Sequence, residues 1–338
     1  MRTACKSHQD PSQSTVFPPL VLGLLIAMVS ATTAPAGPPE ALESLGPQRI
    51  PALIKLLGDP DYFVRVEAAY TLQKIGPPAV PALTTLIRDP NSSMRYRALM
   101  TLGRMESAAK PAIPAMIDAL RDPEWDVRRM AVGALERMGL EARDAVPALA
   151  LLLRDPEPNI RTAAARVLRK LGPFAVPVLT EMVRDADGNA RYRAIVALGR
   201  IGPDARTAIP AIASSVRDRE WGVRKAAVDA LEEMGAEAKI AIPALAVLLR
   251  DPEPNIRTAA ARVLSKLGPP AVPVLTDLVH DSDAAVRYHA ILALGRMGGD
   301  AQTAVPAITS ALQDPDWVVH QTATDALRQI RKSVLPSR

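Results

Sequence analysis

The sequence predicts an all-α protein, an α-solenoid in which nine short helical hairpins stack into a right-handed superhelix. Three observations support this fold class. A proline-initiated motif recurs nine times from residue 50 onward, an Asp follows each proline by eight residues, and a stripe of small and aliphatic residues follows each Asp. Aromatic residues make up only 3% of the 338 residues, whereas a large single globular core usually contains more.

The first helix of each repeat is expected to begin at a proline that follows Ile or Val. Proline suits the first helical turn because its missing N–H would have no partner there. The intervals between these prolines are 30, 33, 33, 30, 33, 33, 30 and 33 residues. The nine prolines are Pro51, Pro81, Pro114, Pro147, Pro177, Pro210, Pro243, Pro273 and Pro306. The Asp eight residues later should end this helix and turn the chain.

The second helix of each repeat is expected to begin about five residues after the Asp. Its apolar residues fall on one helical stripe, such as Val64, Ala68 and Leu72 in the first repeat. An Ala recurs at one position of all nine repeats, which indicates that another backbone approaches closely there. Gly suits the end of a helix, and Gly closes most second helices, as at Gly76, Gly139, Gly172, Gly202, Gly235 and Gly268.

Helices this short are marginal alone, so the hairpins must bury their stripes against their neighbours. The predicted solenoid spans residues 41–338. A longer period groups its repeats into three blocks, 50–145, 146–241 and 242–338, and residues 146–175 match residues 242–271 at 26 of 30 positions. Similar surfaces should therefore recur every three repeats.

The N-terminal segment differs in character from the repeats. Two basic residues, an apolar stretch over 20–29 and small residues up to Ala31 predict a signal peptide over residues 1–31, followed by a linker over 32–40. The protein is then expected outside the cytoplasm, in the periplasm or extracellular space, with no membrane span after cleavage. An uncleaved membrane anchor and a disordered tail are the alternatives. Cys5, the only cysteine, lies in the leader, so the mature chain would hold no disulfide.

The interhelical Asp is followed six residues later by Arg in eight of the nine repeats, from Asp59 and Arg65 to Asp281 and Arg287, and by His320 in the last. This pattern resembles HEAT repeats, and the 30-residue unit is most similar to the short HEAT-like repeats of phycobilin lyases. The resemblance implies an Asp/Arg ladder between adjacent repeats. It also implies a protein-interaction scaffold.

Aromatic residues follow the 96-residue period and are the candidate partner-binding residues. Solenoids offer long concave surfaces, and Tyr, Trp and Arg often dominate interface energetics. We therefore expect the tyrosines and their basic or His neighbours to line the concave face and the tryptophans to line one edge, in the turn before the second helix. Packing between repeats is the alternative for both sets. The candidates are Tyr96, Arg97, Tyr192, Arg193, Tyr288, His289, Trp125, Trp221 and Trp317.

Catalytic motifs are lacking in the sequence. It contains no Gly-rich phosphate loop and no Ser-centred nucleophile turn, and the three His after the leader occupy different positions in their repeats. No cofactor and no metal site is therefore predicted, and the function expected is that of a monomeric, non-catalytic scaffold for a protein partner. The alternatives are an auxiliary protein to an enzyme or chromophore, of phycobilin-lyase type, and a nucleic-acid-binding solenoid. Nucleic acid is not the partner favoured, because the mature chain carries only about four excess positive charges and structural positions explain most of its arginines.

Overall fold

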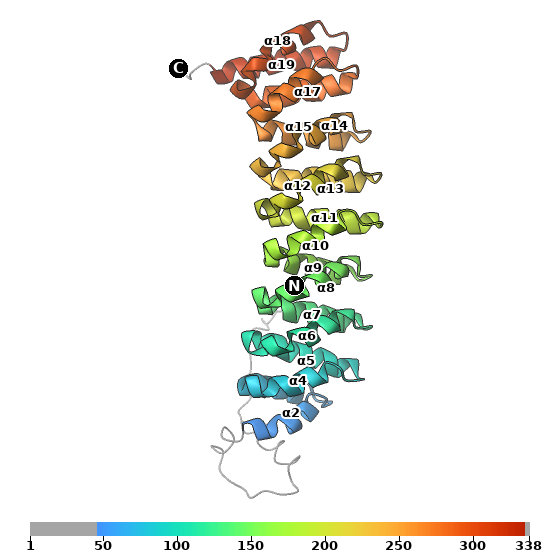
Figure 1. The fold of residues 1–338 in the computed structure, drawn as a ribbon, viewed down its shortest axis with the longest axis vertical. Coiled ribbons are helices and arrows are strands. Elements are labelled where there is room, and N and C mark those ends of the chain that lie inside the picture. Colours follow the sequence, from blue (N-terminus) through green and yellow to red (C-terminus); the bar gives the residue numbers. More distant parts are fainter. Residues whose placement is uncertain (1–45, 335–338) are drawn as a thin grey trace, which may run out of the picture. The chain divides into compact units, whose positions relative to one another are not determined.

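The structure, a computed structural model, describes residues 46–334, and within that range it contains helices and no strand. The predicted all-α solenoid is confirmed (Figure 1). The chain divides into two compact units, Met1–Ala119 and Leu120–Arg338. The predicted signal peptide (1–31) and linker (32–40) lie outside the described residues, as does the start of the predicted solenoid at 41–45.

Each predicted repeat contributes two α-helices in the described range. In the first unit these are α2 (Ile50–Leu56), α3 (Tyr62–Ile75), α4 (Val80–Leu86), α5 (Ser92–Arg104) and α6 (Ile113–Asp118). In the second unit the first helices of the repeats are α8 (Val146–Leu151), α10 (Val176–Met182), α12 (Ile209–Ser214), α14 (Ile242–Val247), α16 (Val272–Leu278) and α18 (Val305–Ser310). The second helices are α7 (Trp125–Met138), α9 (Pro158–Leu171), α11 (Gly188–Ile201), α13 (Trp221–Glu233), α15 (Pro254–Leu267), α17 (Ala284–Met297) and α19 (Trp317–Val334).

The helix ends follow the sequence signals. Every first helix carries its proline in the first turn, and the six predicted closing glycines have φ between +53° and +74°. The second helix is predicted to begin about five residues after the Asp, and this is wrong by two residues. In the structure the helix begins three residues after the Asp. The Asp carboxylate accepts the N–H two residues later in all nine turns, at 2.8–3.0 Å, and this tightens the turn.

The connections between repeats explain the two repeat lengths. Each connection is a 3₁₀ segment of either seven residues, as in η6 (Gly139–Ala145), or three to four residues, as in η8 (Gly172–Ala175). The seven-residue segments produce 33-residue steps, and the shorter ones produce the 30-residue steps at η3 (Pro77–Ala79), η8 and η13 (Pro269–Ala271). Step length therefore sets the position of one hairpin against the next.

The core of each unit lies between stacked hairpins. The Ala that recurs in all nine repeats has no exposed surface in any of them, and the Leu four residues later is fully buried in eight. Burial of these side chains favours folding by about 25 cal/mol per Å² of apolar surface. Two backbones approach closely at Gly199 in α11, where an added Cβ would lie 2.9 Å from the Cα of Ala230 in α13.

We predict opposite effects for two Gly→Ala substitutions in second helices. Gly199→Ala should lower the free energy of unfolding by about 1–3 kcal/mol, because the new methyl group meets the backbone of α13. Gly133→Ala in α7 should raise it by up to about 1 kcal/mol, since no atom beyond the nearby backbone of α7 itself lies within 4 Å of the added Cβ and Ala favours helix. Urea unfolding of the two variants measures the difference, and equal stability would contradict the close approach.

Candidate functional site

The Arg six residues after the interhelical Asp donates hydrogen bonds to other groups of the solenoid. At the 33-residue steps of the second unit its Nε and Nη2 donate to the Asp carboxylate of the next repeat, at 2.6–3.1 Å. Its Nη1 donates to the carbonyl of the Asp in its own turn. The pairs are Arg128 and Asp155, Arg191 and Asp218, Arg224 and Asp251, and Arg287 and Asp314. These bonds raise the pKa of the four guanidinium groups, and the ladder implied by the resemblance is present at these steps.

The 30-residue steps use different groups. Here the Arg immediately before the Asp of one repeat pairs with the Asp of the next, in Arg154 with Asp185 and in Arg250 with Asp281. The ladder Arg bonds only to carbonyls of its own turn, and the buried Nε of Arg257 has no partner. A three-residue change in the connection therefore changes which charges meet between repeats.

Three of the candidate binding residues occupy these short steps. Arg97 donates to the Leu57 carbonyl and Arg193 to the Leu153 carbonyl of the preceding repeat, both at 2.8 Å. Burial lowers the pKa of both guanidinium groups. His289 has the corresponding position in the last block and is only 6% exposed. All three side chains thus have contacts inside the repeats, and their role in partner binding stays a prediction.

His289 is a buried ring whose surroundings lower its pKa and so disfavour the charged form. Its Nδ1 lies 2.7 Å from the Ala285 carbonyl, which can only accept, so Nδ1 carries the proton and Nε2 faces the Thr258 hydroxyl at 3.5 Å. Burial lowers the pKa of the ring, and Arg257 and Arg296 add to that effect, against opposing contributions from the Ala285 carbonyl and Asp283.

The tryptophans lie on the surface, at the first position of a second helix rather than in the turn before it as predicted. The tight turn described above brings the helix start forward to these residues. Trp125, Trp221 and Trp317 are 48%, 62% and 69% exposed and begin α7, α13 and α19. The intervening second helices of this unit begin with small or flat residues, and we call the whole set the tryptophan row: Trp125, Pro158, Gly188, Trp221, Pro254, Ala284 and Trp317.

The tyrosines lie four residues further along the second helix than the tryptophan-row position. Residues four apart share one face of a helix, so Tyr192 and Tyr288 lie on the same face as the tryptophan-row residue of their own helix. Tyr192 is 44% exposed, while Tyr96 and Tyr288 are half-buried. In α7 the equivalent residue is Arg129, whose guanidinium lies 5.7 Å from the Trp125 ring.

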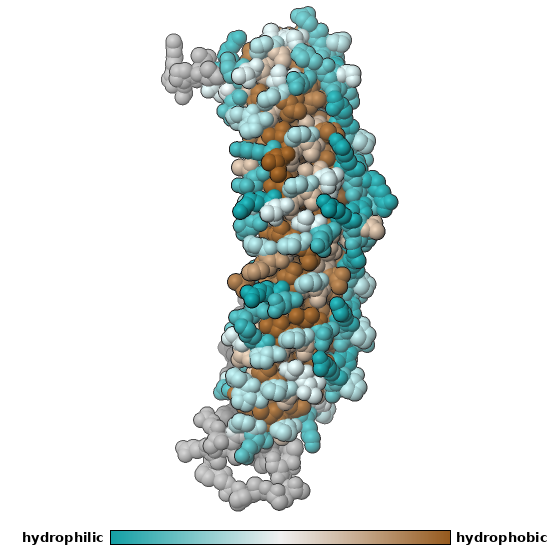
Figure 2. All heavy atoms as spheres, in the orientation of Figure 1, coloured by the Kyte–Doolittle hydropathy of each residue, from teal (hydrophilic) through white to brown (hydrophobic). Residues whose placement is uncertain are grey.

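Carboxylates precede the tryptophan row. Each second helix of the unit has an acidic residue immediately before its first residue, which we call the carboxylate row: Glu124, Glu157, Asp187, Glu220, Glu253, Asp283 and Asp316. Figure 2 shows hydrophilic side chains along the edge where Figure 1 places the turns between first and second helices of this unit. Sequence reasoning missed this row, although its signal was the acidic residue before every helix start.

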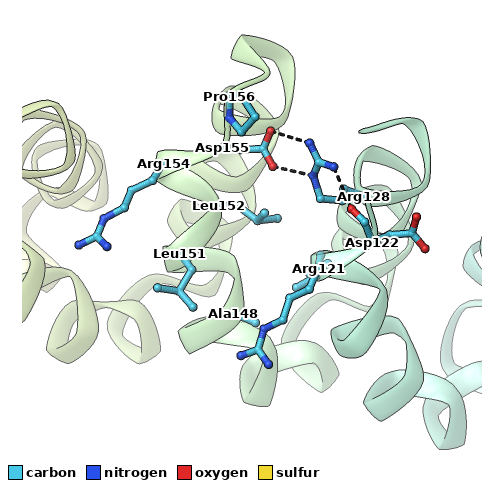
Figure 3. Close-up of a pocket in the computed structure, with 10 residues that line it drawn as sticks. Arg121, Asp122, Arg128, Ala148, Leu151, Leu152, Arg154, Asp155 and Pro156 are labelled. Atoms are coloured by element: carbon cyan, nitrogen blue, oxygen red, sulfur yellow. Dashed lines mark hydrogen bonds and ion pairs between the residues drawn. The ribbon is translucent and has the colours of Figure 1, made fainter. Parts of the chain in front are cut away.

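A hollow of about 370 Å³ opens on the side of the first helices, between α8 and the turn before α7 (Figure 3). The Arg128–Asp155 pair closes one end of it, and Leu151 and Ala148 lie along its side. Arg121 and Arg154 point away from the turn that carries Asp155 and Pro156.

Within residues 46–334 no group of three or more His, Cys, Asp or Glu side chains is placed to hold a metal ion, and none of the helices is long and apolar enough to span a bilayer.

These stacked hairpins define the class of the protein, an α-solenoid. Its sequence matches HEAT repeats over residues 50–114, 80–169, 113–188, 176–246 and 272–336, with a further HEAT repeat at 241–269. The chain belongs to the HEAT-repeat family.

Two solved structures show what the chain is similar to. An engineered protein aligns with a TM-score of 0.42 and 22% identity, over 87% of this chain and 92% of that one. Importin beta, crystallised in an ammonium sulfate condition, aligns with a TM-score of 0.49 and 14% identity, over 95% of this chain and 50% of that one. This chain therefore covers about half the length of importin beta. Among curated proteins, none matches the sequence.

The ladder pairs should contribute far more to stability than exposed ion pairs. Asp251→Asn leaves the part-buried Arg224 guanidinium without its carboxylate, so we predict a loss of about 2–4 kcal/mol in the free energy of unfolding. Asp325→Asn removes an exposed pair with Arg328 in the same unit and should cost less than about 0.5 kcal/mol. Urea unfolding at neutral pH compares them; similar losses would show that the ladder is not a stabilising element.

The buried imidazole predicts a pH dependence. Because the folded pKa of His289 lies below the unfolded value, the unfolded chain binds the proton first as the pH falls below about 6.5. Stability should therefore be complete above that pH and decline below it. His289→Gln should abolish this part of the decline, whereas His280→Gln, at an exposed position, should retain it. Chemical unfolding measured between pH 5 and 8 tests this, and identical profiles for wild type and His289→Gln would refute it.

Proposed function

We propose that this HEAT-repeat solenoid is a non-catalytic scaffold that binds an extended segment of a protein partner along the surface formed by its second helices. The observation that supports this most strongly is the exposure of Trp125, Trp221 and Trp317 at one helix position, three repeats apart. Tryptophan is a large amphipathic side chain that is enriched in interface hot spots. Because all three occupy the same position of their repeats, they can act as repeated anchors for a bound segment, unlike exposed residues scattered over the surface.

The chemistry of the charged residues supports a scaffold over an enzyme. The buried Arg side chains of the ladder form ion pairs with its Asp side chains and donate hydrogen bonds to turn carbonyls. They therefore connect adjacent repeats. A catalytic centre instead needs a perturbed group facing a concave pocket with a partner for the reacting atom. The hollow beside Arg128 is lined by groups of this structural kind and by aliphatic side chains.

Tyr192 and Tyr288 extend the proposed surface from the tryptophan row along the second helices. Each lies one helical turn beyond the tryptophan-row position of its own helix, so a bound segment would meet aromatic rings from two rows. Repetition of the same groups allows one long segment, or several copies of a short one, to bind with increased avidity. The predicted leader supports a partner in the periplasm or at the outer side of a bacterial membrane.

We predict that the double substitution Tyr192→Ala, Tyr288→Ala lowers partner affinity about tenfold or more while the helical circular dichroism stays unchanged. The partner is first captured with the mature chain from its own envelope fraction, and its affinity for both proteins is then measured by calorimetry. Phe174→Ala removes an exposed ring from a connection instead and should leave affinity intact.

Unchanged affinity of the double variant would reject the second-helix surface as the binding site. A visible absorbance band on the purified chain would instead favour the chromophore-related alternative, since a scaffold made only of protein absorbs in the ultraviolet.

A further inference from the structure

The carboxylate row is not explained by helix capping alone. Asp187, Asp283 and Asp316 accept hydrogen bonds from the first turn of the helix that follows, as capping residues do. The glutamates in the row make no such bond, and Glu124, Glu220 and Glu253 are exposed. Glutamate is a poor residue for a side-chain cap, so these positions carry negative charge without the hydrogen bond that would account for it.

The tryptophan row runs beside these carboxylates and contains no charged residue. Between consecutive tryptophans the row contains only a proline and a Gly or Ala. Two small side chains therefore separate each exposed indole from the next. Arg219 is the one basic residue in the turns themselves. Its Nε lies 3.8 Å from Glu220 Oε1, and Nη2 of the ladder residue Arg191 lies 3.5 Å from the same oxygen. Of the arginines that end the first helices, Arg154 and Arg250 pair with the interhelical Asp of the next repeat, Asp185 and Asp281, and not with the carboxylate row. The edge of the second unit therefore combines negative charge with exposed aromatic rings.

We propose that this edge binds an extended basic segment of a partner protein, a statement that rests on the scaffold function proposed above and names its partner class. Lys or Arg side chains of the segment pair with the carboxylate row. Cations and apolar groups of the segment pack on the indole faces, which attract positive charge. Carboxylates and indole rings together select basic peptides over neutral or acidic ones.

The repeat spacing sets the register of the segment. Packed helix layers lie about 8–10 Å apart, and an extended chain advances about 3.3–3.6 Å per residue. One repeat then corresponds to about three residues of the segment, and one tryptophan step to about eight. A segment of about sixteen residues with a basic side chain at about every third position spans from Trp125 to Trp317.

The test uses the full chain and a phage-displayed library of random peptides of about sixteen residues, the length set by the spacing above. Selected peptides should be enriched in Lys and Arg over the unselected library. Their affinity should fall about tenfold or more between low and high salt, because exposed charges are screened. Peptides that are enriched without basic residues, or that bind equally at both salt concentrations, would overturn the basic-segment proposal.

Matched variants locate the binding of an enriched peptide. Trp221→Ala, Trp317→Ala should weaken it about tenfold, and Glu124→Gln, Glu253→Gln should weaken it and reduce its salt dependence. Phe174→Ala and Glu181→Gln, at exposed positions outside both rows, are the controls and should change nothing. Equal effects of row and control variants would overturn the proposal.

The two levels of the hypothesis fail in different ways. If the library gives no binding peptide at all, the scaffold function itself is contradicted. Peptides that bind but are acidic or neutral would leave the scaffold function standing and contradict the basic partner. The same holds if only the tyrosine double variant lowers the affinity of the peptides.

Discussion

The structure depends on burial between hairpins that are too short to be stable alone. First helices of six or seven residues cannot nucleate on their own, and they persist because Leu53, Leu149 or their equivalents are fully covered by neighbouring helices. Within a unit, an inner hairpin packs against both neighbouring repeats, as α13 does against α11 and α15. The outer faces of the second helices take no part in this burial, so their residues can vary without loss of the core.

Step length links the core to the surface. A seven-residue connection lets the ladder Arg reach the next carboxylate, while a shorter one leaves Arg161 and Arg257 with their own turns only. The groups that bridge short steps, Arg97 and Arg193, therefore recur with the 96-residue period. The tryptophans share that period for a different reason, because nothing in the core requires an exposed ring. The same spacing thus holds both the groups that bridge the short steps and the exposed rings of the proposed binding surface.

Much of the fold could be predicted from the sequence because its signals are local. Proline at the start of a helix, Asp in the turn and Gly at the end act within a few residues, and nine copies remove ambiguity. The start of the second helix was placed two residues late, because the tight Asp turn depends on a side chain bonding to the backbone. The partners of Arg193 and His289 could not be predicted, because they depend on how far one hairpin is displaced against the next. The tryptophans were identified from periodicity, whereas the carboxylate row becomes evident only once the helix starts are known.

The central claim is that stacking, and not the intrinsic stability of a hairpin, holds these helices together. The most direct measurement is the far-ultraviolet circular dichroism of a peptide spanning residues 209–234, which contains α12 and α13, compared with the full chain. The account predicts a largely unfolded peptide and a cooperatively melting, highly helical chain. A monomeric peptide with the helix content it has in the chain, and a melting transition of its own, would contradict it.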